Sequence, residues 1–197
     1  VTSVRSAGDA IVPEVGVSHY AASHPRLCPR VFLASPLIDG DPPYHRDVGY
    51  ALTDLTKVSA LVDDMAAWNV TTLKIYVGTS REIGRAVIKH GHRHGMKVTA
   101  HLGRYTAQQA AADGIDCLEH IWSVFNYSIP ADLANQPDHR ANLDLQNPKC
   151  RQLVALLAER QVAIDPTLVV FQNMIYLNPY RSGLRCTSQS LIKKASK

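Results

Sequence analysis

The chain has 197 residues, of which 46% are hydrophobic and 19% charged, and its formal net charge is +4 at pH 7. This composition is typical of a globular protein that buries one sizeable core. The basic residues are too scattered to form a nucleic-acid-binding stripe, and no apolar run reaches the roughly 18 residues of a membrane-spanning helix. We therefore expect one globular domain that binds neither nucleic acid nor a membrane.

The four cysteines are widely separated and form no CxxC pair. This spacing indicates neither a zinc ribbon nor a disulfide-stapled secreted scaffold. The chain opens on V-T-S-V-R-S-A-G-D, without a methionine, and this stretch looks like the end of a strand. We expect that the N-terminus, including any signal peptide, is absent, so the sequence leaves the cellular location open.

Short β-rich segments alternate with helical periods along most of the chain, as in the βα units of a parallel sheet. The strands are predicted near residues 1–5, 31–35, 72–77, 97–102, 116–121 and 162–170. The helices are predicted around residues 12–24, 53–70, 80–94, 106–114 and 147–161.

Two long loops, 36–52 and 121–146, each follow a strand, on the side where α/β folds place binding sites. The alternation ends near residue 170, and the rest is polar. We expect a domain over residues 1–170 and an unassigned tail over 171–197.

Several helix ends carry recognisable signals. Thr53 or Asp54 suits the start of the second helix, and Pro148 suits the first turn of the last one. Gly95 and Gly114 are expected to end the helices that precede them.

A lysine stands in the middle of the strand predicted near 72–77. Alternation puts Leu73 and Ile75 on the face that packs under helices, and Lys74 on the opposite face with Tyr76. A buried lysine must lose its charge or find a partner. Lys74 is therefore either paired with a carboxylate or kept neutral for reaction, as a Schiff base or as a carbamate formed with carbon dioxide.

Two histidines end the next two strands. Alternation turns His101 inward, and His120 holds the corresponding strand end, with Glu119 expected on the opposite face. Lys74, His101 and His120 thus come from three strands and lie toward the carboxyl side, where barrel active sites are built. Imidazole is a common zinc ligand, and two histidines with one carbamate oxygen would leave open positions for water. The sequence predicts a metal site at this edge of the sheet.

Other polar residues receive plainer interpretations. We expect Glu119 to form a salt bridge to a helix residue. His90 and His94 are four residues apart, but we assign them to a solvent-facing last helical turn, where they complement the helix dipole. Asp39 and Asp41 look first like turn-forming residues.

Arg104 and Tyr105 follow His101 closely, where a guanidinium fork could hold a substrate carboxylate. We predict a substrate-binding role for both residues. Arg5 ends a strand on the same presumed side and is a further candidate for the site.

These motifs, taken together, resemble a known family. The segments V-T-S-V-R-S-A-G-D, P-R-V-F-L-A-S-P-L-I-D-G, T-L-K-I-Y-V, K-V-T-A-H-L-G, G-I-D-C-L-E-H-I and V-A-I-D-P-T-L-V-V occur in the order seen in metal-dependent amidohydrolases. The resemblance covers residues 1 to about 170. It points to the imidazolonepropionase-like branch, which includes Xaa-Pro and Xaa-Arg dipeptidases.

The resemblance implies an α/β fold, a partial (β/α)₈ (TIM) barrel with about six βα units, corresponding to strands two to seven. It also implies one or two divalent metals, with zinc as the expected metal, Lys74 carboxylated to bridge them, and His101 and His120 as metal ligands. In that scheme a bridging hydroxide attacks an amide or ester carbonyl, and an aspartate on strand eight takes up the proton. The implied substrate is a small amide or dipeptide.

Two parts of the family pattern have no counterpart here. The His-x-His pair of strand one would precede Val1, and the aspartate of strand eight would follow Lys197. The resemblance therefore implies an internal piece of a barrel without its first and last strands, which leaves unpaired edges and half of the metal ligands. We expect little or no amide hydrolysis by this piece alone, and the sequence leaves a homo-oligomer open.

Two other functions fit the same residues. One is a lyase or aldolase barrel that uses Lys74 as a Schiff base, and the other is an inactive remnant that binds metal. Borohydride trapping of a carbonyl substrate on Lys74 would favour the first. Metal content that does not change in the Lys74→Ala and His101→Ala variants would make both residues structural.

Overall fold

The structure, a computed structural model, describes residues 1–129 and 143–170. Residues Val1–Pro166 belong to one compact unit, and the described residues 167–170 fall outside it. All strands named below and the candidate site lie in this unit. The predicted tail, 171–197, lies outside the described residues.

The described part of the chain contains a six-stranded parallel sheet in the order β4-β3-β5-β6-β7-β8. Its strands are β3 (Ala34–Asp39), β4 (Gly49–Ala51), β5 (Thr72–Ile75), β6 (Lys97–His101), β7 (Cys117–Glu119) and β8 (Ala163–Asp165). A separate parallel pair consists of β1 (Ser3–Arg5) and β2 (Arg30–Phe32), and Leu33 alone separates β2 from β3. The predicted α/β class is confirmed, and the sheet is that of a partial (β/α)₈ barrel.

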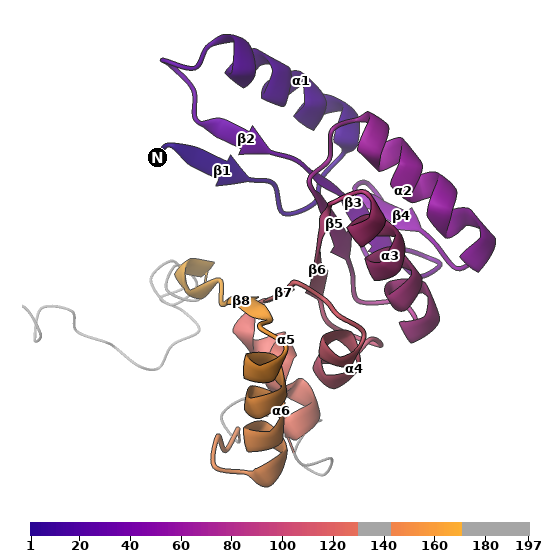
Figure 1. The fold of residues 1–197 in the computed structure, drawn as a ribbon, viewed down its shortest axis with the longest axis vertical. Coiled ribbons are helices and arrows are strands. Elements are labelled where there is room, and N and C mark those ends of the chain that lie inside the picture. The colour runs from indigo at the N-terminus through magenta and orange to yellow at the C-terminus, as the bar shows by residue number, and fades with distance from the viewer. Residues whose placement is uncertain (130–142, 171–197) are drawn as a thin grey trace, which may run out of the picture. The chain divides into compact units, whose positions relative to one another are not determined.

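Helices connect these strands (Figure 1). They are α1 (Ile11–Ser23), α2 (Val58–Ala67), α3 (Arg81–Arg93), α4 (Ala107–Ala112), α5 (Ile121–Phe125) and α6 (Pro148–Glu159), with short 3₁₀ turns η1 (Leu55–Lys57) and η2 (Asn126–Ser128). Helix α3 packs against α2 and against strands β5 and β6, and α4 packs against α3 and α6. None of the helices among the described residues is long and apolar enough to cross a membrane.

The predicted helix signals are confirmed at several ends. The side chain of Asp54 accepts the N–H of Thr56 at the start of η1, just before α2. Pro148 lies in the first turn of α6, as predicted. The reciprocal capping box of Thr106 and Gln109 at the start of α4 was not predicted. Gly95 and Gly114 follow α3 and α4 with φ of +71° and +93°, values that favour glycine.

The core lies between the sheet and the helices. Leu73 and Ile75 of β5 and Val98 and Ala100 of β6 are fully buried there, as the alternation predicted. Since successive side chains of a strand point to opposite faces, Lys74 and its neighbours in register occupy the other face, which would be the interior of the barrel.

The predicted loop 36–52 is partly wrong, because β3 runs on to Asp39 and β4 follows at Gly49. Pro36 lies within β3, although proline has no N–H to donate to a strand ladder. The pairing of β3 with β5 shifts register at this point, between Ala34 and Leu37. Such an irregularity tolerates a residue without an N–H, so the strand continues past Pro36.

Two further boundaries differ from the prediction. The loop expected from residue 121 begins instead with helix α5 directly after β7, while residues 130–142 of that loop lie outside the described range. The last strand, expected over 162–170, ends at Asp165, and residues 168–170 are helical. Pro166 ends the strand because it has no N–H to donate to the ladder.

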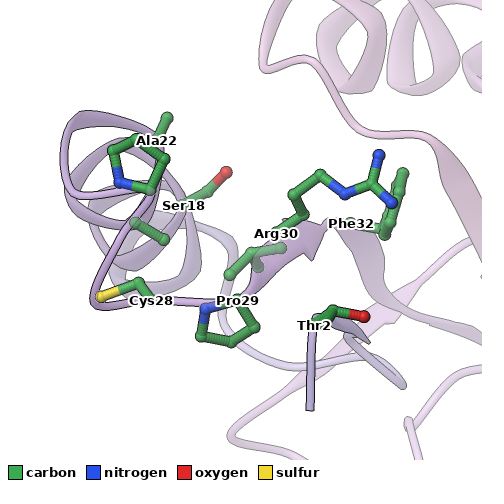
Figure 2. A pocket seen from close by; sticks show the side chains of 10 residues that line it. Thr2, Ser18, Ala22, Cys28, Pro29, Arg30 and Phe32 are labelled. Atoms are coloured by element: carbon green, nitrogen blue, oxygen red, sulfur yellow. The ribbon is translucent and has the colours of Figure 1, made fainter.

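A cavity of about 610 Å³ lies between α1 and β2, and Figure 2 shows the side chains around it. It is lined by Thr2, Ser18, Ala21, Ala22, Pro25, Cys28, Pro29, Arg30, Val31 and Phe32. This cavity shares no lining residue with the candidate site.

Candidate functional site

Strand register brings Tyr76 and His101 to the same end of the sheet, just beyond Lys74. Lys74 of β5 is paired with Thr99 of β6 in a parallel ladder. Tyr76 and His101, each two residues further along, therefore lie side by side, with ring centroids 4.8 Å apart. Both rings project from the carboxyl ends of their strands, the edge at which parallel α/β folds build sites.

His120 joins this pair from the next strand. Its ring meets that of His101 edge to face, with centroids 4.6 Å apart. His120 follows β7 directly and has φ of +60°, which ends the strand geometry and starts α5. The structure thus brings Lys74, His101 and His120 to one region of the inner face.

The expected orientation of Glu119 is wrong. The register pairs Glu119 of β7 with His101 of β6, so the two side chains share the inner face. The prediction continued the alternation through His120, but the positive φ of His120 breaks it. Glu119 consequently points inward and is 2% exposed, and it pairs with strand residues rather than with a helix.

Further aromatic rings surround the two histidines. The indole of Trp122 stacks on His120 with centroids 4.9 Å apart and ring planes 14° apart. Nε2 of His45, in the β3–β4 loop, is 3.1 Å from the hydroxyl of Tyr76. Sequence reasoning missed His45 and Trp122 as site residues. Trp122 could have been noticed as an aromatic two residues beyond a strand-end histidine, whereas nothing local marks His45.

His45, Tyr76 and His120 border a small open cavity of about 270 Å³. It is lined by Ala7, Gly8, Leu37, His45, Val48, Lys74, Tyr76, Glu119 and His120. The cavity therefore gives the lysine, one of the two histidines and a phenol a common space that a small ligand can enter.

Lys74 is almost fully buried, and its Nζ lies against Oε2 of Glu119. Among the described residues Nζ has no hydrogen-bond acceptor besides this carboxylate. Burial lowers the pKa of the Lys74 ammonium to about 7, and nearby Arg5 acts in the same direction. The Glu119 carboxylate has the opposite effect, because it favours the charged ammonium. Lys74 can therefore be either a neutral amine or an ammonium paired with Glu119.

The Glu119 carboxylate has two more partners on its other oxygen. Nη2 of Arg5 donates to Oε1 at 3.0 Å, and the hydroxyl of Thr99 donates to the same oxygen at 2.9 Å. Arg5 also reaches Oδ2 of Asp165 at 3.3 Å. Arg5 thereby links the end of β1 to the ends of β7 and β8 across the inner face.

Both histidines favour the neutral imidazole. Burial lowers the pKa of His101 to about 4, with His120 and then Lys74 adding to the effect. The pKa of His120 is also lowered, first by burial and then by Lys74. At pH 7 both rings therefore have a ring nitrogen free of its proton, which is the form that binds a metal ion.

Asp39 serves the turn that the sequence assigned to it. Its Oδ1 accepts the N–H groups of Gly40 and Gly78, at 2.9 and 2.6 Å, and its Oδ2 accepts that of Tyr44 at 2.7 Å. The carboxylate thus ties the loop after β3 to the end of β5 and so supports the loop that carries His45.

The two predicted substrate-binding residues lie in different surroundings. Arg104 is exposed just beyond β6. Tyr105 is 1% exposed in the hydrophobic core, where its ring packs against Gly84 of α3 and its hydroxyl donates to Oδ2 of Asp113 at 3.0 Å. A side chain enclosed in this way has no surface for substrate, so Tyr105 is a packing residue of the helix layer.

The histidines at the end of α3 lie on the outside of the sheet. His90 lies in the last turn of α3, as expected, but is half-buried, whereas His94, which caps the helix, is exposed and its Nε2 contacts Asp63. His92 in the same turn is exposed and contacts Asp116. None of the three belongs to the inner face of the sheet.

Within residues 1–129 and 143–170, no three His, Cys, Asp or Glu side chains are grouped so that they could hold a metal ion. A metal at His101 and His120 would therefore require a third ligand of another kind, and Lys74 is the buried nitrogen beside them.

Comparison with solved structures identifies the architecture. A bottromycin amidohydrolase superimposes with a TM-score of 0.57 and 18% identity, over 68% of this chain and 30% of its own. A candidate prolidase from Bifidobacterium longum gives 0.55 and 19%, over 83% of this chain and 51% of its own. The fold is that of an amidohydrolase-type barrel.

A third amidohydrolase structure matches this barrel with a TM-score of 0.50 and 16% identity, over 83% of the chain. The chain spans about half or less of the length of these three structures, with 30%, 51% and 54% of them covered. No protein-family model and no curated protein matches the sequence. The likeness to amidohydrolases therefore establishes the barrel and its partial extent.

Proposed function

We propose that the amidohydrolase-type barrel to which this chain contributes hydrolyses carbon–nitrogen bonds of small amides or dipeptides, with a divalent metal ion as cofactor. The observation that carries the proposal is the convergence of Lys74, His101 and His120. They come from three successive strands, and each has a lowered pKa on the inner face. Packing alone gives no reason to gather three nitrogen bases in one small region.

The side chains present fit such a metal. Two neutral imidazoles supply nitrogen ligands, and a buried amine with a pKa of about 7 is partly in the neutral form that adds carbon dioxide. The resulting carbamate would supply oxygen ligands. Histidine and carbamate ligands suit zinc, manganese or cobalt, and we take zinc as the cofactor to test first.

When bound, the metal would polarise the scissile carbonyl and lower the pKa of a bound water. His101 and His120 would hold it, and the indole of Trp122 would keep the His120 ring in its plane. Tyr76 lies in the cavity wall, and burial raises the pKa of its phenol, so it stays protonated and can donate to a carbonyl or carboxylate oxygen of the substrate. Arg104 remains a predicted substrate contact.

A Schiff-base function of Lys74 is the second candidate, because a lysine with a pKa near 7 is also a nucleophile. The neighbouring pair of histidines favours the hydrolase. Borohydride reduction in the presence of small aldehydes and ketones separates the two. A stable adduct at Lys74, identified by mass spectrometry of the digested protein, would favour the lyase.

The metal proposal is tested by zinc binding to the 197-residue chain. We expect zinc to remain after dialysis, as measured by elemental analysis, and to fall at least about tenfold in His101→Ala and His120→Ala. His19→Ala is the matched control, since His19 is an exposed residue of α1. Equal zinc content in all four proteins would contradict the proposal.

A further inference from the structure

The cavity beside Lys74 has one wall that consists of apolar residues. Leu37 of β3 is the register partner of Lys74 in β5, so the two side chains share the inner face. The N–H of Leu37 donates to the carbonyl of Val48 at 3.0 Å, which holds Val48 against the same strand. Both residues line the cavity, as do Ala7 and Gly8 of the loop between β1 and α1. We call these four residues the apolar wall.

The apolar wall extends to the stem of Lys74. A Cβ built on Gly8 would collide with Cδ2 of Leu37 and would lie 3.2 Å from Cγ of Lys74. The backbone of Gly8 therefore packs against both side chains and joins the Leu37 side chain to the lysine stem. A substrate group that lies beside Lys74 is consequently next to hydrocarbon on this side of the cavity.

The charged side chains of the cavity are already paired. Apart from its histidines, the described residues that line the cavity include two charged side chains, Lys74 and Glu119, and these contact each other. An acidic or basic substrate group in this space would lose hydration without gaining an ion pair of its own. The lining therefore favours an uncharged group.

The cavity is also small. Its volume of about 270 Å³ lies below the roughly 300 Å³ at which pockets for drug-sized ligands begin. Binding strengthens with the apolar surface that is removed from water, so a short branched aliphatic group gains most from the contact with the apolar wall.

We propose that Leu37 and Val48 are specificity-determining residues, which bind a small aliphatic group beside the scissile carbonyl of the substrate. This inference rests on the proposed function and names its substrate class. The class consists of amides or dipeptides whose group next to the scissile carbonyl is short, branched and uncharged.

Hydroxamates with different acyl groups test the proposal, because they share one zinc-binding headgroup. Acetohydroxamate, 3-methylbutanohydroxamate and the charged 3-carboxypropanohydroxamate are titrated into the zinc-loaded 197-residue chain, and the affinities are measured by calorimetry. We expect 3-methylbutanohydroxamate to bind about tenfold more tightly than acetohydroxamate, since its isopropyl group leaves water for the apolar wall. 3-Carboxypropanohydroxamate should bind no more tightly than acetohydroxamate.

Two variants test the assignment to the apolar wall. In Leu37→Ala and in Val48→Thr the preference should fall to about threefold or less, while the affinity for acetohydroxamate changes little. Val48→Thr keeps the shape of the side chain at a half-buried position, so it covers the case in which Leu37→Ala fails to fold. Val12→Ala, at an exposed position of α1, is the matched control and should keep the preference.

Each result supports or overturns a defined part of the inference. Equal affinities of the wild type for the two neutral hydroxamates would overturn the inference and leave the proposed function standing, as would tighter binding of the charged one. A preference that persists in both variants would overturn the roles of Leu37 and Val48. A wild type that retains no zinc, or that does not bind acetohydroxamate, would overturn the proposed function and this inference with it.

Discussion

The imidazoles of His101 and His120 meet edge to face at the ends of adjacent strands, with ring centroids 4.6 Å apart. Burial lowers the pKa of His101 from an ordinary 6.5 to about 4, and the neighbouring His120 and Lys74 add to this effect. Two neutral nitrogen bases held this close together are poised to share one ligand.

This shift predicts acid sensitivity of the metal-free protein. A histidine with a lower pKa in the folded state stabilises the fold fully above pH 6.5, and this contribution is lost as pH falls toward 4. The urea midpoint should therefore drop between pH 7 and pH 4.5 in the presence of chelator. His101→Gln should reduce that drop, whereas His19→Gln should retain it. An unchanged pH dependence in His101→Gln would contradict the shift.

Two glycines form a matched pair for backbone strain. Gly8 has φ of +103°, and a Cβ there would lie 2.4 Å from Leu37 Cδ2 and 3.2 Å from Lys74 Cγ. Gly8→Ala should lower the free energy of unfolding by about 1–3 kcal/mol, since the backbone is strained at this positive φ and the Leu37 side chain must shift, with a smaller displacement of the Lys74 stem.

Gly16 lies in helix α1 with nothing within 4 Å of its added Cβ. Gly16→Ala should raise the free energy of unfolding by about 0.5–1 kcal/mol. Denaturant melts of both variants check the pair. A harmless Gly8→Ala would contradict both the positive φ of Gly8 and its close approach to the side chains of Leu37 and Lys74.

Asp39 provides a prediction about the loop that carries His45. In Asp39→Asn the side chain loses its charge and one acceptor oxygen, so its three backbone hydrogen bonds weaken, at a cost of about 2 kcal/mol. Amide hydrogen exchange at Tyr44 and Gly78 should accelerate. Asp41→Asn, at an exposed position of the same loop, should leave exchange at both amides unchanged.

A variant of Tyr105 tests whether this residue contributes to packing or to the site. Tyr105→Phe keeps the buried ring and removes the hydrogen bond to Asp113, so the free energy of unfolding should fall by about 1 kcal/mol. Tyr50→Phe, at an exposed site, should change it little. Zinc binding should be the same in both variants. A loss of zinc in Tyr105→Phe but not in Tyr50→Phe would indicate that Tyr105 contributes to the site.

Alternation and end signals in the sequence were sufficient to predict much of the sheet and of the helix layer. The buried faces of β5 and β6 follow from period-two patterning, and the ends of α3 and α4 follow from Gly95 and Gly114, because these effects are local. Lys74 and His101 could be assigned to the inner face for the same reason. The strand predicted to end near residue 35 continues past Pro36 to Asp39, since a strand irregularity that accommodates proline depends on the partner strand.

Only the tertiary structure decided which groups meet across the inner face. The direction of Glu119 depends on its register with His101 and on the positive φ of His120, and neither is visible in local alternation. The contact of Arg5 with Glu119 joins residues far apart in the chain, and the burial of Tyr105 depends on Gly84 of helix α3. Sequence patterns report the solvent preference of each residue, whereas the partner of a buried charge is set by strand pairing and by the need for neutrality in a medium of low polarity.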